Sequence, residues 1–180
     1  CTFAVFPSTR MSDDVLEPYN CTLGVHGLLQ EADQVLVLDN EALHRISFRE
    51  LRVPAPRYED LNYFAALAMS GVTSPLRFEG HLNSDLRKLT VNMVPFPDLP
   101  FLVMGLAPIS RSIYRAITVP EITHCLFDAR NMMCEVDPRR GRFLSASAMF
   151  RGRMSEGEVV YQLDRLRSQV ASQPLLQFHS

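Results

Sequence analysis

Tryptophan and lysine are nearly absent from this sequence of 180 residues, which has no tryptophan and a single lysine, Lys88. Because the chain has 18 basic residues in all, the other 17 are arginine, and 20 acidic residues give a formal net charge of −2 at pH 7. Proteins that bind nucleic acid through phosphate contacts carry a positive field, which this composition does not supply. We therefore expect no nucleic-acid partner.

Cysteine is scarce and widely spaced. The four cysteines, Cys1, Cys21, Cys125 and Cys134, form no C-x-x-C pair, and the five histidines show neither H-x-x-x-H nor H-E-x-x-H spacing. We therefore expect free thiols in a reducing, cytosolic compartment and no metal site. A continuous apolar run of about 18 residues, which a membrane helix requires, is also missing, so we expect no membrane partner.

Glycine is spread too thinly for a phosphate-binding loop. The eight glycines never form G-x-x-x-x-G-K-[ST] or G-x-G-x-x-G, the motifs whose backbone N–H groups hold phosphate. Any group that grips phosphate is therefore outside this chain or absent. The chain does have 47% hydrophobic and 21% charged residues, a composition typical of chains that fold around a core.

Strands and helices alternate in the first part of the chain, which predicts an α/β class. Residues 2–6 predict a strand, followed by a polar loop and a helix over 19–29. Residues 35–38 predict a buried strand that opens into another helix. That helix has an apolar face and a basic face, formed by Leu43, Ile46 and Leu51 and by Arg45, Arg49 and Arg52.

The middle of the chain predicts a buried helix. Residues 60–74 are apolar nearly all round, as expected for a central helix covered on every side. Pro75 should end or kink it, because an interior proline costs a helix roughly 3 kcal/mol. A short helix is expected over 84–93.

The second half begins with a proline-rich connector at 95–100, where we place a subdomain boundary. An apolar strand over 101–106 follows. The capping boxes that begin at Thr118 and Ser155 predict two more helices. Between them, apolar and small polar residues alternate over 144–150, which predicts a half-buried strand.

Polar residues near strand ends indicate a ligand site, because open α/β sheets bind ligands beyond the carboxyl ends of their strands. Residues 8–13 follow the first strand and Asn40 follows the second. Tyr58 and Asn62 are spaced i, i+4, which places both on one helix face. A ring that stacks and amides that read a base edge suit a purine. From the residues alone, however, Asn40 as a helix cap and Tyr58 as a packing anchor are favoured over a role in ligand binding.

Seven strings along the chain, in the same order, closely resemble β-tubulin. They are 17–20 (EPYN), 39–43 (DNEAL), 70–73 (SGVT), 82–89 (LNSDLRKL), 91–97 (VNMVPFP), 131–134 (NMMC) and 150–155 (FRGRMS). The resemblance runs from about Thr2 to Leu166.

The resemblance implies a tubulin-like α/β fold. Residues 1–57 would be the back half of a Rossmann-like GTP-binding domain, 58–77 a central buried helix, and 78–180 an α/β intermediate domain lacking its C-terminal part. The family's phosphate loop would lie before Cys1.

The same resemblance assigns nucleotide contacts. Asn40 and Asn62 match the asparagines that hydrogen-bond guanine, and Tyr58 matches the ring that stacks on it. Asp13 and Glu17 fall in the region that touches the ribose. GTP or GDP is the implied cofactor, with Mg²⁺ whose ligands lie outside this chain.

Subunit contacts are implied as well. Asn83, Asp85 and Lys88 match the segment that docks on the nucleotide of the next subunit, where α-tubulin has a catalytic glutamate at the Lys88 position. This chain should therefore leave its neighbour's GTP intact and contribute no catalytic residue.

Side-to-side contacts between protofilaments would use a loop about three residues shorter than the family's. That loop runs over 109–113, and the implied lateral contacts are Ser110 and Arg111 within it and Tyr114 directly after it. The implied partners are α-tubulin, neighbouring β-tubulin and microtubule-associated proteins, in cytoplasmic microtubules. Two alternatives stay open: a tubulin-fold fragment or binding module that does not polymerise, and a self-sufficient GTPase.

Overall fold

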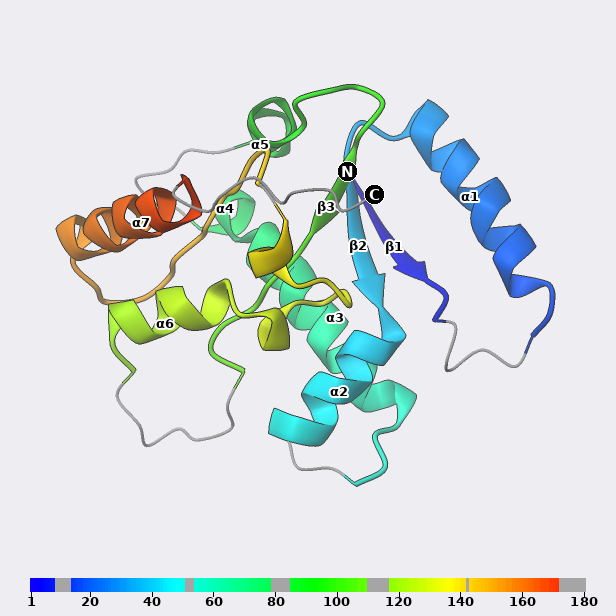
Figure 1. Ribbon diagram of the computed structural model, residues 1–180, viewed down its shortest axis with the longest axis horizontal. Coiled ribbons are helices and arrows are strands. Elements are labelled where there is room, and N and C mark those ends of the chain that lie inside the picture. The colour runs from blue at the N-terminus through cyan, green and yellow to red at the C-terminus, as the bar shows by residue number, and fades with distance from the viewer. Residues whose placement is uncertain (9–13, 51–53, 79–84, 110–116, 142, 172–180) are drawn as a thin grey trace, which may run out of the picture.

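A three-stranded parallel sheet forms the centre of the computed structural model (Figure 1). Its strands are β1 (Thr2–Phe6), β2 (Val35–Asp39) and β3 (Phe101–Val103), in the order β1-β2-β3. In the register, Val35 lies opposite Thr2 on one side and Phe101 on the other. The sheet confirms the α/β class. The structure describes residues 1–8, 14–50, 54–78, 85–109, 117–141 and 143–171.

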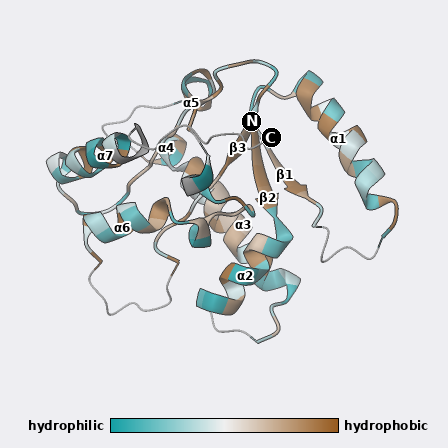
Figure 2. Ribbon diagram, in the orientation of Figure 1, coloured by the Kyte–Doolittle hydropathy of each residue, from teal (hydrophilic) through white to brown (hydrophobic). Residues whose placement is uncertain are grey.

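The central strand is buried because its sequence is apolar on both faces. All side chains from Val35 to Leu38 are buried, and Figure 2 shows the hydrophobic colouring concentrated along the strands. Helix α1 (Glu17–Glu31) connects β1 to β2 on the β1 side of the sheet and carries no buried residue. The predicted strand 35–38 and helix 19–29 are therefore confirmed.

Helix α2 (Asn40–Glu50) follows β2 without a connecting loop and is amphipathic as predicted. Leu43 and Ile46 enter the core, with 2% and 1% of their surface exposed. Arg45 and Arg49 lie on the exposed side. The remaining predicted face residues, Leu51 and Arg52, fall outside the described part of the chain.

Helix α3 (Tyr58–Val72) corrects the expectation of a helix buried on every side. Only one stripe is buried, formed by Leu61, Phe64 and Ala68, and Leu67 on the other side is 36% exposed. The stripe packs on α2 and the core, and no described element covers the opposite side. The helix also begins two residues earlier than predicted.

Proline ends α3 as expected. The helix stops at Val72, and Pro75 lies in the first turn of a separate short helix, α4 (Ser74–Arg77), where a missing N–H costs nothing. Helix α5 (Leu86–Met93) confirms the predicted short helix.

Strand β3 follows the proline-rich connector and pairs with β2, so residues 95–100 join two parts of one sheet. It ends at Val103 rather than at 106. Gly105 then forms an isolated bridge with Met132. A side chain at Gly105 would meet the Leu126 carbonyl oxygen at 2.6 Å, so only glycine allows this close approach.

The two helices predicted from capping boxes are present. Helix α6 (Val119–Leu126) begins after Thr118, whose N–H donates to Glu121 Oε2 at 3.2 Å. Two 3₁₀ turns follow, η1 (Ala129–Asn131) and η2 (Pro138–Arg140), and α7 (Glu156–Ala171) begins directly after Ser155.

The strand predicted over 144–150 is wrong, because these residues are irregular. Ser145 Oγ donates instead to the Met93 carbonyl oxygen at 2.6 Å. Alternation alone does not form a strand without a neighbouring edge to pair with. In the sheet as described, β3 pairs with β2 and not with this segment. No helix among the described residues is long and apolar enough to cross a membrane.

Candidate functional site

Polar residues gather where β1 and β2 end, as predicted for the carboxyl edge of the sheet. Ser8 Oγ donates to Glu41 Oε2 at 2.6 Å, and the Glu41 N–H donates to Asp39 Oδ1 at 2.9 Å. Ser8 and Glu41 are buried, whereas Asn40 between the two carboxylates is half-buried. The edge therefore holds a buried hydrogen-bonded pair beside the residue predicted to contact a base.

Burial sets the electrostatics of this edge. It raises the pKa of Asp39 above its usual value, and the nearby charges of Glu41 and Glu135 add to the rise. The pKa of the Cys134 thiol is also raised, first by burial and then by the charge of Asp39. Arg45 pairs with Glu135 at 3.1 Å. The Cys134 thiol is therefore close enough to Asp39 for the charge of that carboxylate to raise its pKa, a proximity that the sequence pattern did not predict.

Replacing Asp39 with asparagine should stabilise the fold at neutral pH. The folded state holds the Asp39 proton more tightly than the unfolded state, so wild-type stability falls as pH rises between the two pKa values. Asparagine keeps an oxygen for the Glu41 N–H without a charge to desolvate. Denaturant unfolding across pH should show an advantage for Asp39→Asn at pH 7 that narrows as the pH falls through the raised pKa of Asp39 and is gone below the ordinary pKa of aspartate.

A matched control for this variant is Asp98→Asn, which removes an exposed carboxylate and should leave the stability curve within about 0.5 kcal/mol of wild type. Lower stability of Asp39→Asn at pH 7 would contradict the dominant role of burial.

The two other predicted base contacts lie on the first turns of α3. Tyr58 is the first residue of α3 and is 74% exposed, and Asn62 is exposed one turn later. Helices α2 and α3 pack together, and in Figure 1 the start of α3 lies at the same end of the sheet as α2. None of the hydrogen bonds between described residues joins the side chains of Asn40, Tyr58 and Asn62.

Three of the other predicted contact residues lie in the described part of the chain, and five lie outside it. Glu17 opens α1 and is half-buried. Asp85 and Lys88 are exposed, just before and within α5. Asp13, Asn83, Ser110, Arg111 and Tyr114 lie outside the described residues.

Helix α5 sits at the end of the sheet opposite to α2 (Figure 1). Thr90 Oγ1 on α5 donates at 2.7 Å to Oε1 of Gln34, which immediately precedes β2. Asn40, by contrast, immediately follows β2. The predicted base contact and the predicted inter-subunit helix are therefore separated by the length of the central strand.

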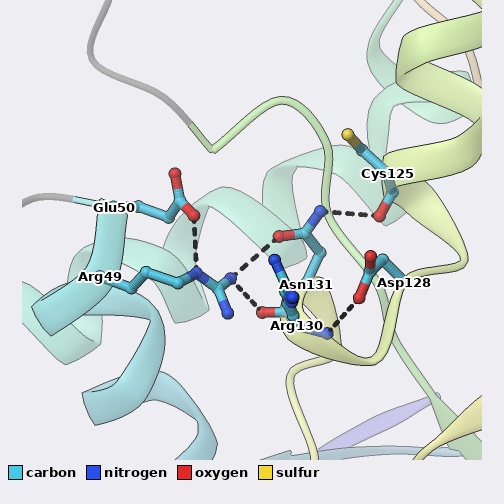
Figure 3. Close-up of polar contacts among 6 residues, drawn as sticks. All are labelled: Arg49, Glu50, Cys125, Asp128, Arg130 and Asn131. Atoms are coloured by element: carbon cyan, nitrogen blue, oxygen red, sulfur yellow. Dashed lines mark hydrogen bonds and ion pairs between the residues drawn. The ribbon is translucent and has the colours of Figure 1, made fainter.

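The far end of α2 is fastened to the second half of the chain (Figure 3). Arg49 Nη2 donates to the Arg130 carbonyl oxygen at 2.6 Å and to Asn131 Oδ1 at 3.3 Å. Asn131 Nδ2 in turn donates to the Cys125 carbonyl oxygen at 2.7 Å. The basic face predicted for α2 thus binds main-chain and amide oxygens more than 80 positions away.

An apolar groove of about 460 Å³ runs between β3, α3 and α5, with residues 143–149 along it. Gln34 is one of the polar residues that line it; the residue is fully buried, and its Nε2 has no hydrogen-bond partner among the described residues. Asn40, Tyr58 and Asn62 do not line it, so the groove is distinct from the predicted nucleotide site. In the described part of the chain, no group of three or more His, Cys, Asp or Glu side chains could hold a metal ion.

Residues 97–177 match the family model described as the tubulin C-terminal domain. The matched range contains β3, α6 and α7. This match supports a tubulin-family, cytoskeletal protein, and the small parallel sheet flanked by helices fits a tubulin-like α/β fold. The match suggests other tubulins as partners in general.

Proposed function

We propose that this chain is a β-tubulin-like subunit of microtubules, which binds a guanine nucleotide and polymerises head to tail with α-tubulin. The observation that carries the proposal is the opposite placement of the two predicted contact regions. Asn40 lies at the carboxyl end of β2. Helix α5 is hydrogen-bonded to Gln34, which lies at the amino end of β2. A subunit that holds its own nucleotide at one end and meets its neighbour's at the other has the polarity of a head-to-tail polymer.

The exposure and the chemistry of the described residues support a site for the nucleoside part of GTP or GDP. The Tyr58 ring is 74% exposed and available for stacking, and Asn62 presents an amide on the same helix face. Asn40 supplies a second amide from α2, and Glu17 with Asp13 would contact the ribose. GTP, when bound, would supply the phosphoanhydride bond that hydrolysis cleaves, and Mg²⁺ would accompany its phosphates on ligands outside this chain.

Hydrolysis in this proposal depends on the partner. Lys88 is exposed on α5, and an ammonium group has three donors and no acceptor, so it cannot take a proton from an attacking water. This chain therefore leaves its neighbour's GTP intact, while the glutamate of α-tubulin completes hydrolysis of the GTP that this chain holds. Side-to-side contacts with neighbouring β-tubulin would use Ser110, Arg111 and Tyr114, and microtubule-associated proteins would bind the cytoplasmic polymer.

Polymers assembled with α-tubulin test both parts of the proposal. The wild-type chain should enter the pellet with the polymer. Lys88→Glu should add slow phosphate release from the normally inert site, because a carboxylate can position the attacking water. Pelleting and phosphate release can be measured on the same sample.

Arg87→Glu is the matched control, since it makes the same charge change at the adjacent exposed position of α5. It should leave phosphate release at the wild-type rate. A chain that stays in the supernatant would favour a tubulin-fold module that does not polymerise. Filaments of Lys88→Glu without added release would contradict the role of Lys88.

A further inference from the structure

The geometry points to Glu41 as a positioning residue for guanine selectivity: its buried carboxylate, fixed by Ser8, holds Asn40 in place at the end of β2. This inference rests on the proposed nucleotide site. Ser8 is 8% exposed and Glu41 is 9% exposed. Glutamate is rarely buried to this degree without a partner, and a hydroxyl that donates to a carboxylate forms one of the stronger hydrogen bonds in proteins.

The Ser8–Glu41 hydrogen bond joins the segments that follow two neighbouring strands. Ser8 follows β1 by two residues and Glu41 follows β2 by two residues, 33 positions apart in sequence. Because β1 and β2 pair directly, the bond fixes the first turn of α2 relative to the sheet. It is a tertiary contact rather than a local helix cap.

Capping of α2 is already provided by another side chain. Asp39 Oδ1 accepts the Glu41 N–H at 2.9 Å, so the Glu41 carboxylate is available for Ser8. Its negative charge also suits the positive end of the helix dipole. Asn40 therefore lies between two residues whose side chains are hydrogen-bonded. The Asp39 carboxylate accepts from the Glu41 N–H of the helix, and the Glu41 carboxylate accepts from Ser8, which follows β1.

The opposite end of α2 cannot readily move to compensate. Arg49 in the last turn holds the Arg130 carbonyl oxygen at 2.6 Å (Figure 3). With both ends tied, a change at Glu41 should act on the position of Asn40 rather than on the whole helix. Guanine and adenine present different donors and acceptors, so a displaced amide affects the two bases unequally.

The test measures GDP and ADP dissociation constants for the full chain and three variants. Glu41→Ala and Ser8→Ala should each reduce the preference for GDP over ADP roughly tenfold, the scale of a lost hydrogen bond to a charged group. Glu41→Gln keeps an oxygen that can accept from Ser8 and should retain most of the preference. Glu31→Ala, an exposed carboxylate at the end of α1, is the control.

Two results would overturn the inference. One would also overturn the proposed nucleotide site, and the other would not. A wild-type chain with no preference for GDP removes the nucleotide site itself and this inference with it. A wild-type preference that survives unchanged in Glu41→Ala and Ser8→Ala removes only the role of Glu41. If Glu41→Ala does not fold, Ser8→Ala decides, with hydrogen exchange at the Asn40 and Glu41 amides reporting the lost restraint without any nucleotide.

Discussion

Tyr58→Ala is expected to weaken GDP binding by about 1–3 kcal/mol, or roughly 5- to 150-fold, which is the range measured for aromatic stacking on bases. Tyr58 begins α3 and is 74% exposed, so its ring is accessible to a ligand and contributes little to the core. Stability should change by no more than about 0.5 kcal/mol, as for surface substitutions generally. Isothermal titration with GDP and denaturant unfolding measure the two quantities.

Tyr19→Ala is the control for Tyr58, because Tyr19 is similarly exposed, at 69%, on α1. It should leave GDP affinity at the wild-type value. Conversely, Tyr58→Phe keeps the stacking face and should bind nearly as well as wild type. Unchanged affinity in Tyr58→Ala would remove Tyr58 from the site.

Phe64→Ala should produce the largest loss of stability, about 3–5 kcal/mol. Phe64 is 1% exposed on the buried stripe of α3 and lies in the cluster that joins the sheet, α2 and α3. Removing its ring leaves a cavity that neighbouring side chains fill only in part. A loss of this size is a large share of the roughly 5–15 kcal/mol that stabilises an ordinary domain.

Phe48→Ala provides the comparison, since Phe48 is 58% exposed on α2 and should cost far less. Phe64→Leu should fall between the two and remain measurable if the alanine variant does not fold. Equal losses at Phe48 and Phe64 would contradict the placement of the core.

Local patterns predicted the elements whose structure depends on adjacent residues. The apolar run 35–38 predicted the buried strand, and the polar residues after it predicted that a helix follows. The apolar and basic faces of α2 were also predicted from the sequence, because helical periodicity places them on opposite sides. The class of fold and the location of the predicted site followed from these elements.

Features that depend on residues far apart in the sequence could not be predicted from local patterns. The bond between Ser8 and Glu41 exists only because β1 and β2 pair, and no local signal specifies that pairing. Hydropathy showed that α3 is apolar but not which side another element would cover, so Leu67 was expected to be buried. Residues 144–150 alternate as a strand does, but Ser145 Oγ donates instead to the Met93 carbonyl oxygen, 52 positions away, a contact that alternation does not predict.

The most direct test of the proposed nucleotide site is a GDP titration of the ¹⁵N-labelled chain monitored by NMR, with an ADP titration as the comparison. GDP is expected to shift the amide signals of Asn40, Tyr58 and Asn62, at the carboxyl end of the sheet, and none along α5 at the opposite end. ADP should produce much smaller changes. Shifts confined to α5, or equal responses to GDP and ADP, would contradict a guanine nucleotide site in this part of the molecule.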